Sequence, residues 1–154
     1  MTEQKHKRKQ GSLSISEKRE VPAVRDEIVN SLVELGYHQQ DVFAVRLSSN
    51  EAILNAIQHG NKCDKSKRVT ITYVVDREKA EITVADEGAG FDPSAVPDCT
   101  ADENLCKTWG RGITLMRGFM DVVEFGGRGN RVKLIKSNSS ARPAPADQAQ
   151  TPLE

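Results

Sequence analysis

The chain has 154 residues, about the size of one domain, which leaves room for one core and one active site. Its 22 Lys and Arg residues balance 22 Asp and Glu residues, so no overall electric field would attract nucleic acid or anionic lipid. The longest apolar runs are far shorter than the roughly 20 residues of a membrane span, and no apolar run follows the basic N-terminus. We therefore expect a cytoplasmic protein that binds a small ligand or a protein partner, and neither a membrane nor, directly, nucleic acid.

The N-terminal part of the chain predicts a tail, a strand and a helix. Residues 1–11 are basic and polar and are expected to form a disordered tail. Residues 12–16 alternate polar and apolar side chains, which is typical of a short edge strand. Residues 21–35 carry apolar side chains at helical spacing, with Pro22 in the first turn and Gly36 directly after the end. They predict a first amphipathic helix.

A second helix is predicted over residues 39–59, and it should end at Gly60. Apolar side chains at helical spacing are expected to form its buried stripe, namely Phe43, Leu47, Ile53, Leu54 and Ile57. With about 100° of rotation per residue, a group of polar side chains lies together on another side of this helix. These residues are Glu51, Asn55, Gln58 and His59.

Strands and one further helix are predicted in the second half. Residues 69–75 and 80–85 are rich in β-branched residues and alternate, which indicates a hairpin. Residues 91–108 lack periodicity and contain two prolines, so we interpret them as a long loop that could serve as a lid. A third helix should open at Gly110, and a second hairpin should join residues 122–125 to residues 132–135.

These elements predict an α+β fold, a two-layer sandwich of three helices and a mostly antiparallel mixed sheet. The folded domain is expected to cover residues 12–136. Residues 137–154 contain almost no apolar side chains and are expected to form a disordered C-terminal tail.

A carboxylate and two glycines follow the second strand, as Asp86-x-Gly88-x-Gly90. The glycines allow a tight turn and a close approach of the backbone to a ligand. A buried carboxylate at this position could accept a hydrogen bond from an exocyclic amine such as that of adenine. An ordinary turn is the alternative interpretation.

The sequence Gly110-Arg111-Gly112 lies at the predicted start of the third helix. Free N–H groups, the positive end of the helix dipole and the absence of Cβ atoms favour phosphate binding there. Arg111 could add a positive charge or could simply be solvated. A flexible junction between loop and helix would need the same residues.

Glu51 and Asn55 are four residues apart and therefore adjacent on the second helix. An Asn amide oxygen beside phosphate oxygens suits Mg²⁺, which takes few protein ligands and keeps several waters. A Glu one turn earlier could accept a hydroxyl proton or orient a nucleophile. A solvated helix face is the alternative interpretation.

The order of these motifs resembles that of GHKL ATPases, the gyrase, histidine-kinase and MutL group. The chain carries Glu51-Ala-Ile-Leu-Asn55-Ala-Ile-Gln-His59-Gly60, then the Asp86 motif, then a long loop, then Gly110-x-Gly112. These segments resemble the helix box and the two glycine boxes of that superfamily, each on the expected element. The resemblance implies a histidine-kinase-type ATPase fold that binds ATP and Mg²⁺.

Within that superfamily, the helix box and Phe119-Met120-Asp121 resemble the RsbW and SpoIIAB group of anti-sigma-factor kinases, over residues 12–136. The resemblance implies a serine/threonine protein kinase that phosphorylates a STAS-domain anti-anti-sigma partner and alternatively sequesters a sigma factor. A homodimer is compatible with it. The implied roles are adenine recognition by Asp86, Mg²⁺ binding by Asn55, general-base catalysis by Glu51, and ATP binding by Asn55, Asp86, Gly88, Gly90, Gly110, Arg111 and Gly112.

Two segments depart from the family pattern. Threonines are common after the final glycine, where this chain has Gly129-Asn130-Arg131, so that edge of the pocket must be filled differently and the role of Arg131 stays open. Lys107-Thr108-Trp109 replaces the polar or basic residues usual before the second glycine box, which leaves a lid contact to phosphate or partner in doubt.

Three other interpretations compete with the kinase. A nucleotide-gated protein-binding module would need no general base at position 51. The ATP-binding half of a histidine kinase is disfavoured, because no phosphoacceptor-helix segment precedes residue 12. A zinc site built from His59, Cys63, Cys99 and Cys106 is disfavoured, since the cysteine spacings are not the short pairs of structural zinc sites, and free thiols are expected instead.

Overall fold

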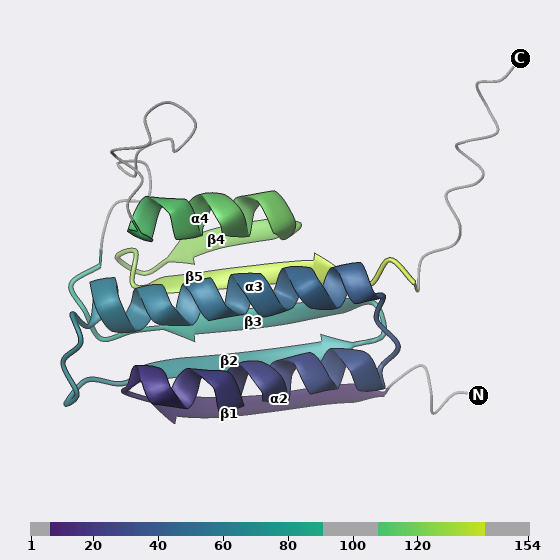
Figure 1. Cartoon of the computed structure of the whole chain (residues 1–154), viewed down its shortest axis with the longest axis horizontal. Coiled ribbons are helices and arrows are strands. Elements are labelled where there is room, and N and C mark those ends of the chain that lie inside the picture. The colour runs from purple at the N-terminus through teal and green to yellow at the C-terminus, as the bar shows by residue number, and fades with distance from the viewer. Residues whose placement is uncertain (1–6, 91–107, 141–154) are drawn as a thin grey trace, which may run out of the picture.

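The computed structural model describes residues 7–90 and 108–140, which form two layers. In the sheet layer the strands are β1 (Arg8–Ile15), β2 (Val69–Asp76), β3 (Lys79–Ala85), β4 (Val122–Gly126) and β5 (Arg131–Ser137). The helical layer contains η1 (Lys18–Glu20), α2 (Val21–Glu34), α3 (Gln39–Asn55), the π-helical turn η2 (Ala56–Gly60) and α4 (Thr108–Phe119). The three α-helices lie side by side on one face of the sheet (Figure 1). The predicted α+β sandwich is confirmed.

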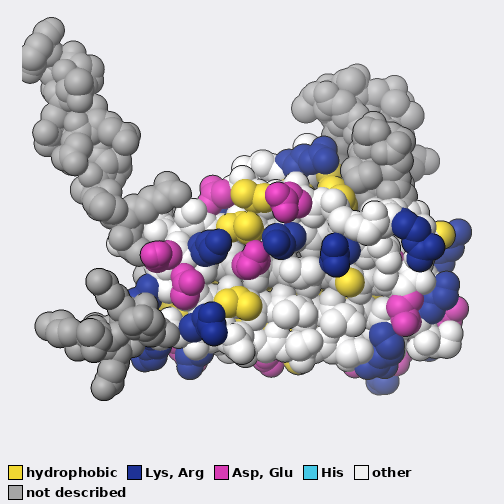
Figure 2. Space-filling view, turned by 180° about the vertical axis from the view of Figure 1, so that it is seen from behind, with side chains coloured by type: hydrophobic (Ala, Val, Ile, Leu, Met, Phe, Trp, Pro, Cys, Tyr) yellow, Lys and Arg dark blue, Asp and Glu magenta, His cyan; other side chains and the backbone are white. Residues whose placement is uncertain are grey.

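The sheet has the strand order β1-β2-β3-β5-β4, and each of these four pairings is antiparallel. No parallel pairing occurs among the described strands, so the mixed character that we expected is not found there. Along β2, buried residues such as Ile71 alternate with exposed ones such as Thr72. The outer face carries basic and acidic side chains side by side (Figure 2). Lys133 on β5 and Glu81 on β3 form an ion pair, in which Nζ and Oε2 lie 3.4 Å apart.

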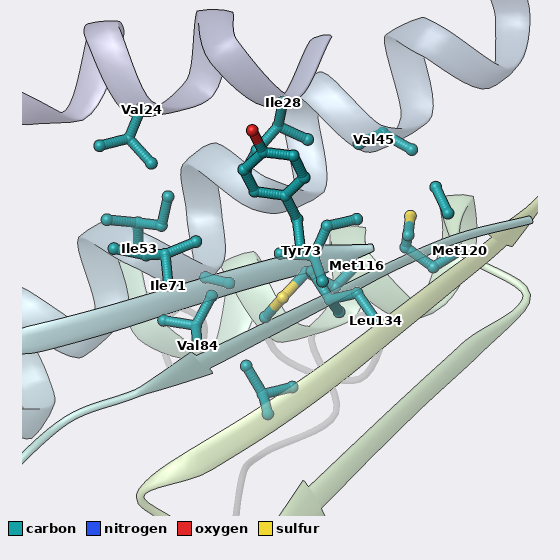
Figure 3. Packing of buried hydrophobic residues seen from close by; sticks show 14 of the residues in the cluster. Val24, Ile28, Val45, Ile53, Ile71, Tyr73, Val84, Met116, Met120 and Leu134 are labelled. Carbon is teal, nitrogen blue, oxygen red and sulfur yellow. The ribbon is translucent and has the colours of Figure 1, made fainter. Parts of the chain in front are cut away.

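The core lies between the sheet and the helices. α2 contributes one side at helical spacing through Val21, Val24, Ile28 and Leu32, all buried. The sheet contributes inward-facing residues that include Ile71, Tyr73, Val84 and Leu134, and α4 adds Met116 (Figure 3). Tyr73 stands upright from β2, and its hydroxyl donates a hydrogen bond to Glu27 Oε2 on α2 at 2.6 Å. One continuous apolar cluster therefore joins both layers.

The predicted buried stripe of α3 is only partly correct. Ile53 and Ile57 are buried, but Phe43 is 55% exposed, and Leu47 and Leu54 are half-buried. α3 is the central helix and packs against α2, α4 and the sheet, so small side chains occupy most of its buried surface. These are Ala44, Ser48, Ser49 and Ala52, and Ala56 follows them at the start of η2. Sequence periodicity favours the largest apolar residues, whereas close packing on several sides favours small ones.

The ends of the folded region differ from the predicted ones. β1 begins at Arg8 and pairs with β2 along its whole length, so residues 8–11 belong to the sheet and not to a tail. At the other end, Asn138 is 2% exposed and its Nδ2 donates to Arg77 O at 2.8 Å. Residues 1–6 and 141–154, which contain the rest of the expected tails, lie outside the described residues.

Between these two ends, the helix boundaries agree closely with the predicted ones. Gly36 follows α2 with φ +81°, the left-handed conformation expected just beyond a helix end. α4 starts at Thr108, two residues earlier than expected. The remainder of the predicted lid, residues 91–107, lies outside the described residues. Within the described ranges, no helix is long and apolar enough to cross a membrane.

Candidate functional site

A cavity of about 180 Å³ lies at one end of the molecule, between the helices and the sheet. Its walls come from the C-terminal end of α3 with η2, from α4, and from the strand region where β3 ends and β5 begins. Ala52, Val84, Ile113 and Met116 supply apolar surface, while Asn55 and Asp86 supply polar groups. A mostly apolar cavity with a few polar groups is the usual form of a small-molecule site.

Glu51 and Asn55 lie together on one side of α3, as their spacing predicted, and the structure shows that this side faces α4. A Cβ atom placed on Gly112 would be 2.9 Å from Glu51 Oε1 and 3.0 Å from Asn55 Nδ2. The absent side chain of Gly112 therefore lets α4 approach both polar groups. The Nδ2 atom of Asn55 is buried and has no hydrogen-bond partner among the described residues. A buried amide without a partner is costly, and a ligand with acceptor oxygens would satisfy it.

Burial raises the pKa of Glu51 above its ordinary value. The carboxylate is half-buried, and the helix backbone on which it stands is held by the core residues Ala52 and Ile53. A carboxyl group with a raised pKa is a stronger proton acceptor once it is ionised. Such a group could accept a proton from a hydroxyl.

Asp86 follows β3 directly and lines the cavity. Burial raises the pKa of Asp86, while the Gly88 N–H and the charge of Lys67 act in the opposite direction. The Gly88 N–H donates to Asp86 Oδ1 at 2.8 Å, which leaves other acceptor positions on the carboxylate available. Such a group can accept a hydrogen bond from an amine in the cavity.

Gly60 and Gly88 lie so close to Asp86 and to each other that neither position has room for a side chain. A Cβ atom on Gly60 would overlap the Asp86 carboxylate, and one on Gly88 would overlap the Gly60 carbonyl oxygen. The π-helical turn η2 brings Gly60 to this position, and such turns are frequent at functional sites. Gly90 has φ +88°, and a Cβ atom there would overlap the Arg128 carbonyl oxygen.

The second glycine motif lies within α4, because this helix begins at Thr108. Gly110 belongs to the first helical turn, whose backbone N–H groups have no intrahelical acceptor and can bind an anion. Gly112 follows one residue beyond that turn and is buried against α3. Arg111 is exposed to solvent.

The cavity also contains residues that the sequence did not single out as binding residues. Gly60, Asn130 and Arg131 line it, as does His59, whose pKa is lowered by burial. Gly60 ends the helix box, so its place in that motif was an available signal. Asn130 ends the β4–β5 turn and Arg131 begins β5. The family resemblance had placed both at an edge of the pocket, but no local pattern gave either of them a binding role.

The alternative zinc site receives no support from the described residues. No group of three potential metal-binding side chains occurs in residues 7–90 and 108–140. Of the proposed ligands, Cys63 is exposed and His59 lines the cavity. Cys99 and Cys106 lie outside the described residues.

Residues 15–136 match the family of histidine kinase-like ATPase domains. A serine-protein kinase RsbW from Bacillus licheniformis is 33% identical over 99 residues, which are 58% of this chain and 60% of that protein. An anti-sigma F factor from Clostridium perfringens is 34% identical over 88 residues, 55% of this chain and 62% of that protein. The matches thus span about 60% of the length of these relatives.

The fold has a counterpart among solved structures. The crystal structure of the RsbU and RsbW domains of Rv1364c from Mycobacterium tuberculosis is similar with a TM-score of 0.54. The similarity covers 83% of this chain and 32% of that chain, at 13% sequence identity, so it concerns the fold alone. Together with the family match over residues 15–136, it leads to the conclusion that the chain belongs to the histidine kinase-like ATPase domain family.

Proposed function

We propose that this chain binds Mg-ATP in the cavity between α3, α4 and the ends of β3 and β5. The observation that carries the proposal is the buried amide nitrogen of Asn55, which has no hydrogen-bond partner among the described residues and lies in a cavity that the Asp86 carboxylate also lines. These groups fit the two ends of ATP, because a carboxylate complements the adenine amine and an amide complements metal and phosphate oxygens. Membership of an ATPase family supports the same ligand.

The binding residues divide by the part of the nucleotide that they contact. Asp86 accepts a hydrogen bond from the adenine amino group, and Gly88 and Gly90 keep the adjoining wall free of side chains. At the phosphate end, the Asn55 oxygen binds Mg²⁺ and the Asn55 nitrogen can donate to a phosphate oxygen. The first turn of α4, which contains Gly110 and Arg111, binds the phosphates together with Gly112 directly after it. Bound Mg²⁺ supplies neutralisation of phosphate charge.

We further propose that the chain is a serine/threonine protein kinase, with Glu51 as its general base. Glu51 orients a serine or threonine hydroxyl of the protein substrate and accepts its proton on a carboxylate oxygen. The position of Glu51 against Gly112, one helical turn before Asn55, supports this role. So does the resemblance to proteins named serine-protein kinase.

The proposed partners follow from the same relatives. A protein named anti-sigma F factor is 34% identical to this chain over 88 residues, which supports a sigma factor as one partner. A STAS-domain anti-anti-sigma protein is proposed as the phosphorylation substrate. The chain would then regulate transcription by choosing between the two partners.

Calorimetric titration with Mg-ATP and Mg-GTP tests the nucleotide assignment. GTP presents a carbonyl oxygen where ATP presents an amine, so it should bind much more weakly beside a carboxylate. Asp86→Ala should weaken ATP binding by about tenfold to a hundredfold, the usual range for a hydrogen bond to a charged group. The exposed residue Asp26 on α2 offers a matched control, since Asp26→Ala removes a carboxylate far from the cavity lining. Equal wild-type affinities for ATP and GTP would refute the assignment.

A further inference from the structure

The peptide group between Asp86 and Glu87 is held by two asparagine side chains. Asn130 Nδ2 donates a hydrogen bond to the Asp86 carbonyl oxygen at 3.1 Å. Asn61 Oδ1 accepts a hydrogen bond from the Glu87 N–H at 2.9 Å. The two polar groups of one peptide are thus bonded by side chains from two different loops, one after η2 and one between β4 and β5.

Both asparagines are themselves fixed in place. Asn61 is 3% exposed, and its Nδ2 donates to the Arg68 carbonyl oxygen at 3.1 Å. Asn130 Oδ1 accepts from the Arg128 N–H at 3.2 Å, and the Asn130 carbonyl oxygen accepts from the Asp86 N–H at 2.9 Å. Each side chain has its amide nitrogen beside a carbonyl and its amide oxygen beside an N–H. Reversing either amide would place like groups together, so these orientations are determined by the partners.

The orientation of this peptide controls the position of the Asp86 carboxylate. The segment that follows contains Gly88 and Gly90, and glycines allow the backbone many conformations. The Gly88 N–H that bonds Asp86 Oδ1 lies only two residues further along. Rotation of the 86–87 peptide would therefore displace the Gly88 N–H and release the carboxylate oxygen that it holds. The two asparagines prevent that rotation because they bond both sides of the peptide.

We propose that Asn61 and Asn130 are positioning residues that hold Asp86 in the direction needed to bind adenine, and thereby set the selectivity for adenine over guanine. The inference rests on the proposed function, in which Asp86 binds the adenine amine. This positioning role needs a carboxamide, because each side chain must donate one hydrogen bond and accept another, and a carboxamide carries both groups on one short side chain.

The test compares Asn61→Ala and Asn130→Ala with Asn138→Ala. Asn138 is a matched control, because it is buried, donates through Nδ2 to a backbone carbonyl and accepts through Oδ1 from Ser140 N–H. It does not line the cavity. We expect the ratio of the GTP and ATP dissociation constants to fall about fivefold to tenfold in the Asn61 and Asn130 variants, as for the loss of one net hydrogen bond. The ratio should not change in Asn138→Ala.

A second measurement tests, without any nucleotide, whether Asn61 and Asn130 hold the 86–87 peptide in place. Amide hydrogen exchange of Glu87 and Gly88 in the free protein should become about tenfold faster in Asn61→Ala and Asn130→Ala, because the bonds that hold this peptide are lost. In Asn138→Ala the same two amides should exchange as in the wild type. Asn130 is half-buried in a turn, so Asn130→Ala should fold. It therefore tests the positioning role if Asn61→Ala does not fold.

The outcomes separate the inference from the proposed function. A wild-type protein without preference for ATP refutes the proposed function. A wild-type preference that stays unchanged in both variants refutes the positioning role, whether or not the exchange rates rise. A fall in selectivity together with faster exchange at Glu87, and neither change in Asn138→Ala, supports it.

Discussion

At the scale of single residues, burial changes the acidity of the two carboxyl groups in the site. The pKa values of Glu51 and Asp86 are both raised because burial disfavours their charged forms. Each group therefore binds its proton more tightly in the folded protein than in the unfolded chain. Stability from this source is fully present at low pH and is lost as the pH rises through the folded pKa. Burial therefore disfavours the ionised forms of Asp86, which lines the cavity, and of Glu51, which lies beside Gly112.

Glu51→Gln should separate catalysis from binding. Affinity for Mg-ATP should be retained, while the phosphorylation rate of a STAS substrate should fall by about a hundredfold to ten-thousandfold, the usual contribution of a general base. Transfer of radiolabelled phosphate measures the rate. A wild-type protein that binds ATP but labels no STAS protein from its own organism would favour the nucleotide-gated binding module instead.

The same substitution should change the dependence of stability on pH. Because the pKa of Glu51 is raised from its ordinary value of 4.5, the ionised wild-type residue costs stability above that pH, and glutamine does not. Glu51→Gln should thus gain thermal stability relative to the wild type as the pH rises from 4.5 toward neutrality. Glu78→Gln, at an exposed position in the β2–β3 turn, serves as the control. A difference in melting temperature that does not vary with pH would contradict the burial argument.

At the scale of elements, the end of α3 forms one wall of the site. The α-helix ends at Asn55, and the π-helical turn η2 then carries the chain to Gly60 beside Asp86. The Asn61 N–H donates to the Ala56 carbonyl oxygen at 2.8 Å, which closes this turn. The helix end thus supplies Asn55 for one part of the cavity and Gly60 for another.

Gly60→Ala and Gly36→Ala should have different effects, although both change a glycine at a helix end. A Cβ on Gly60 would overlap the Asp86 carboxylate, so we expect Gly60→Ala to weaken ATP binding by tenfold or more, about 1.4 kcal/mol. Gly36 has φ +81° with open space around a Cβ, so Gly36→Ala should cost only backbone strain of about 1 kcal/mol. Its ATP affinity should equal that of the wild type. Calorimetry and thermal melting distinguish these results, and equal affinity in both variants would show that Gly60 is not needed beside Asp86.

At the scale of the whole molecule, the end opposite the cavity is closed by the chain segment after β5. Ser139 donates from its backbone N–H and from its hydroxyl to Asp41 Oδ2 on α3, each at 2.8 Å. Asp41 is 5% exposed, so these bonds satisfy a buried carboxylate near the start of the helix. The Asn138 N–H also donates to the Glu78 carbonyl oxygen at 2.8 Å. The segment thereby joins the helical layer to the β2–β3 turn.

Truncation at two points tests this role. A chain that ends at Lys136 loses the bonds of Asn138 and Ser139 and leaves Asp41 without these donors, so it should lose about 1 to 3 kcal/mol of stability. A chain that ends at Ser140 keeps these bonds and should melt at a higher temperature than the chain that ends at Lys136. Mg-ATP affinity measured below the melting temperature should be the same for both, because the cavity lies at the other end of α3. Equal melting temperatures for the two truncations would contradict the inference.

Local spacing in the sequence predicted much of the fold. Alternation over β2 and β3, the helical spacing of α2 and the left-handed glycine at position 36 depend on neighbouring residues, and all were confirmed. The order of the helix box and the glycine boxes likewise indicated the family, and the family match over residues 15–136 confirmed it. Such features are predictable because their causes lie within a few residues along the chain.

The buried face of α3 and the bonds that hold the site together could be seen only once the chain was folded. Phe43 was expected inside and is exposed, because α3 packs against neighbours on several sides and its small residues fit there. The bonds from Asn61 and Asn130 to the 86–87 peptide join positions 26 and 44 residues apart in sequence. Contacts of that kind leave no periodic signal, since they depend on how distant segments meet in space. Most helices and strands and the polar groups of the site could therefore be predicted from local sequence patterns, whereas the geometry of the site depends on how distant segments pack.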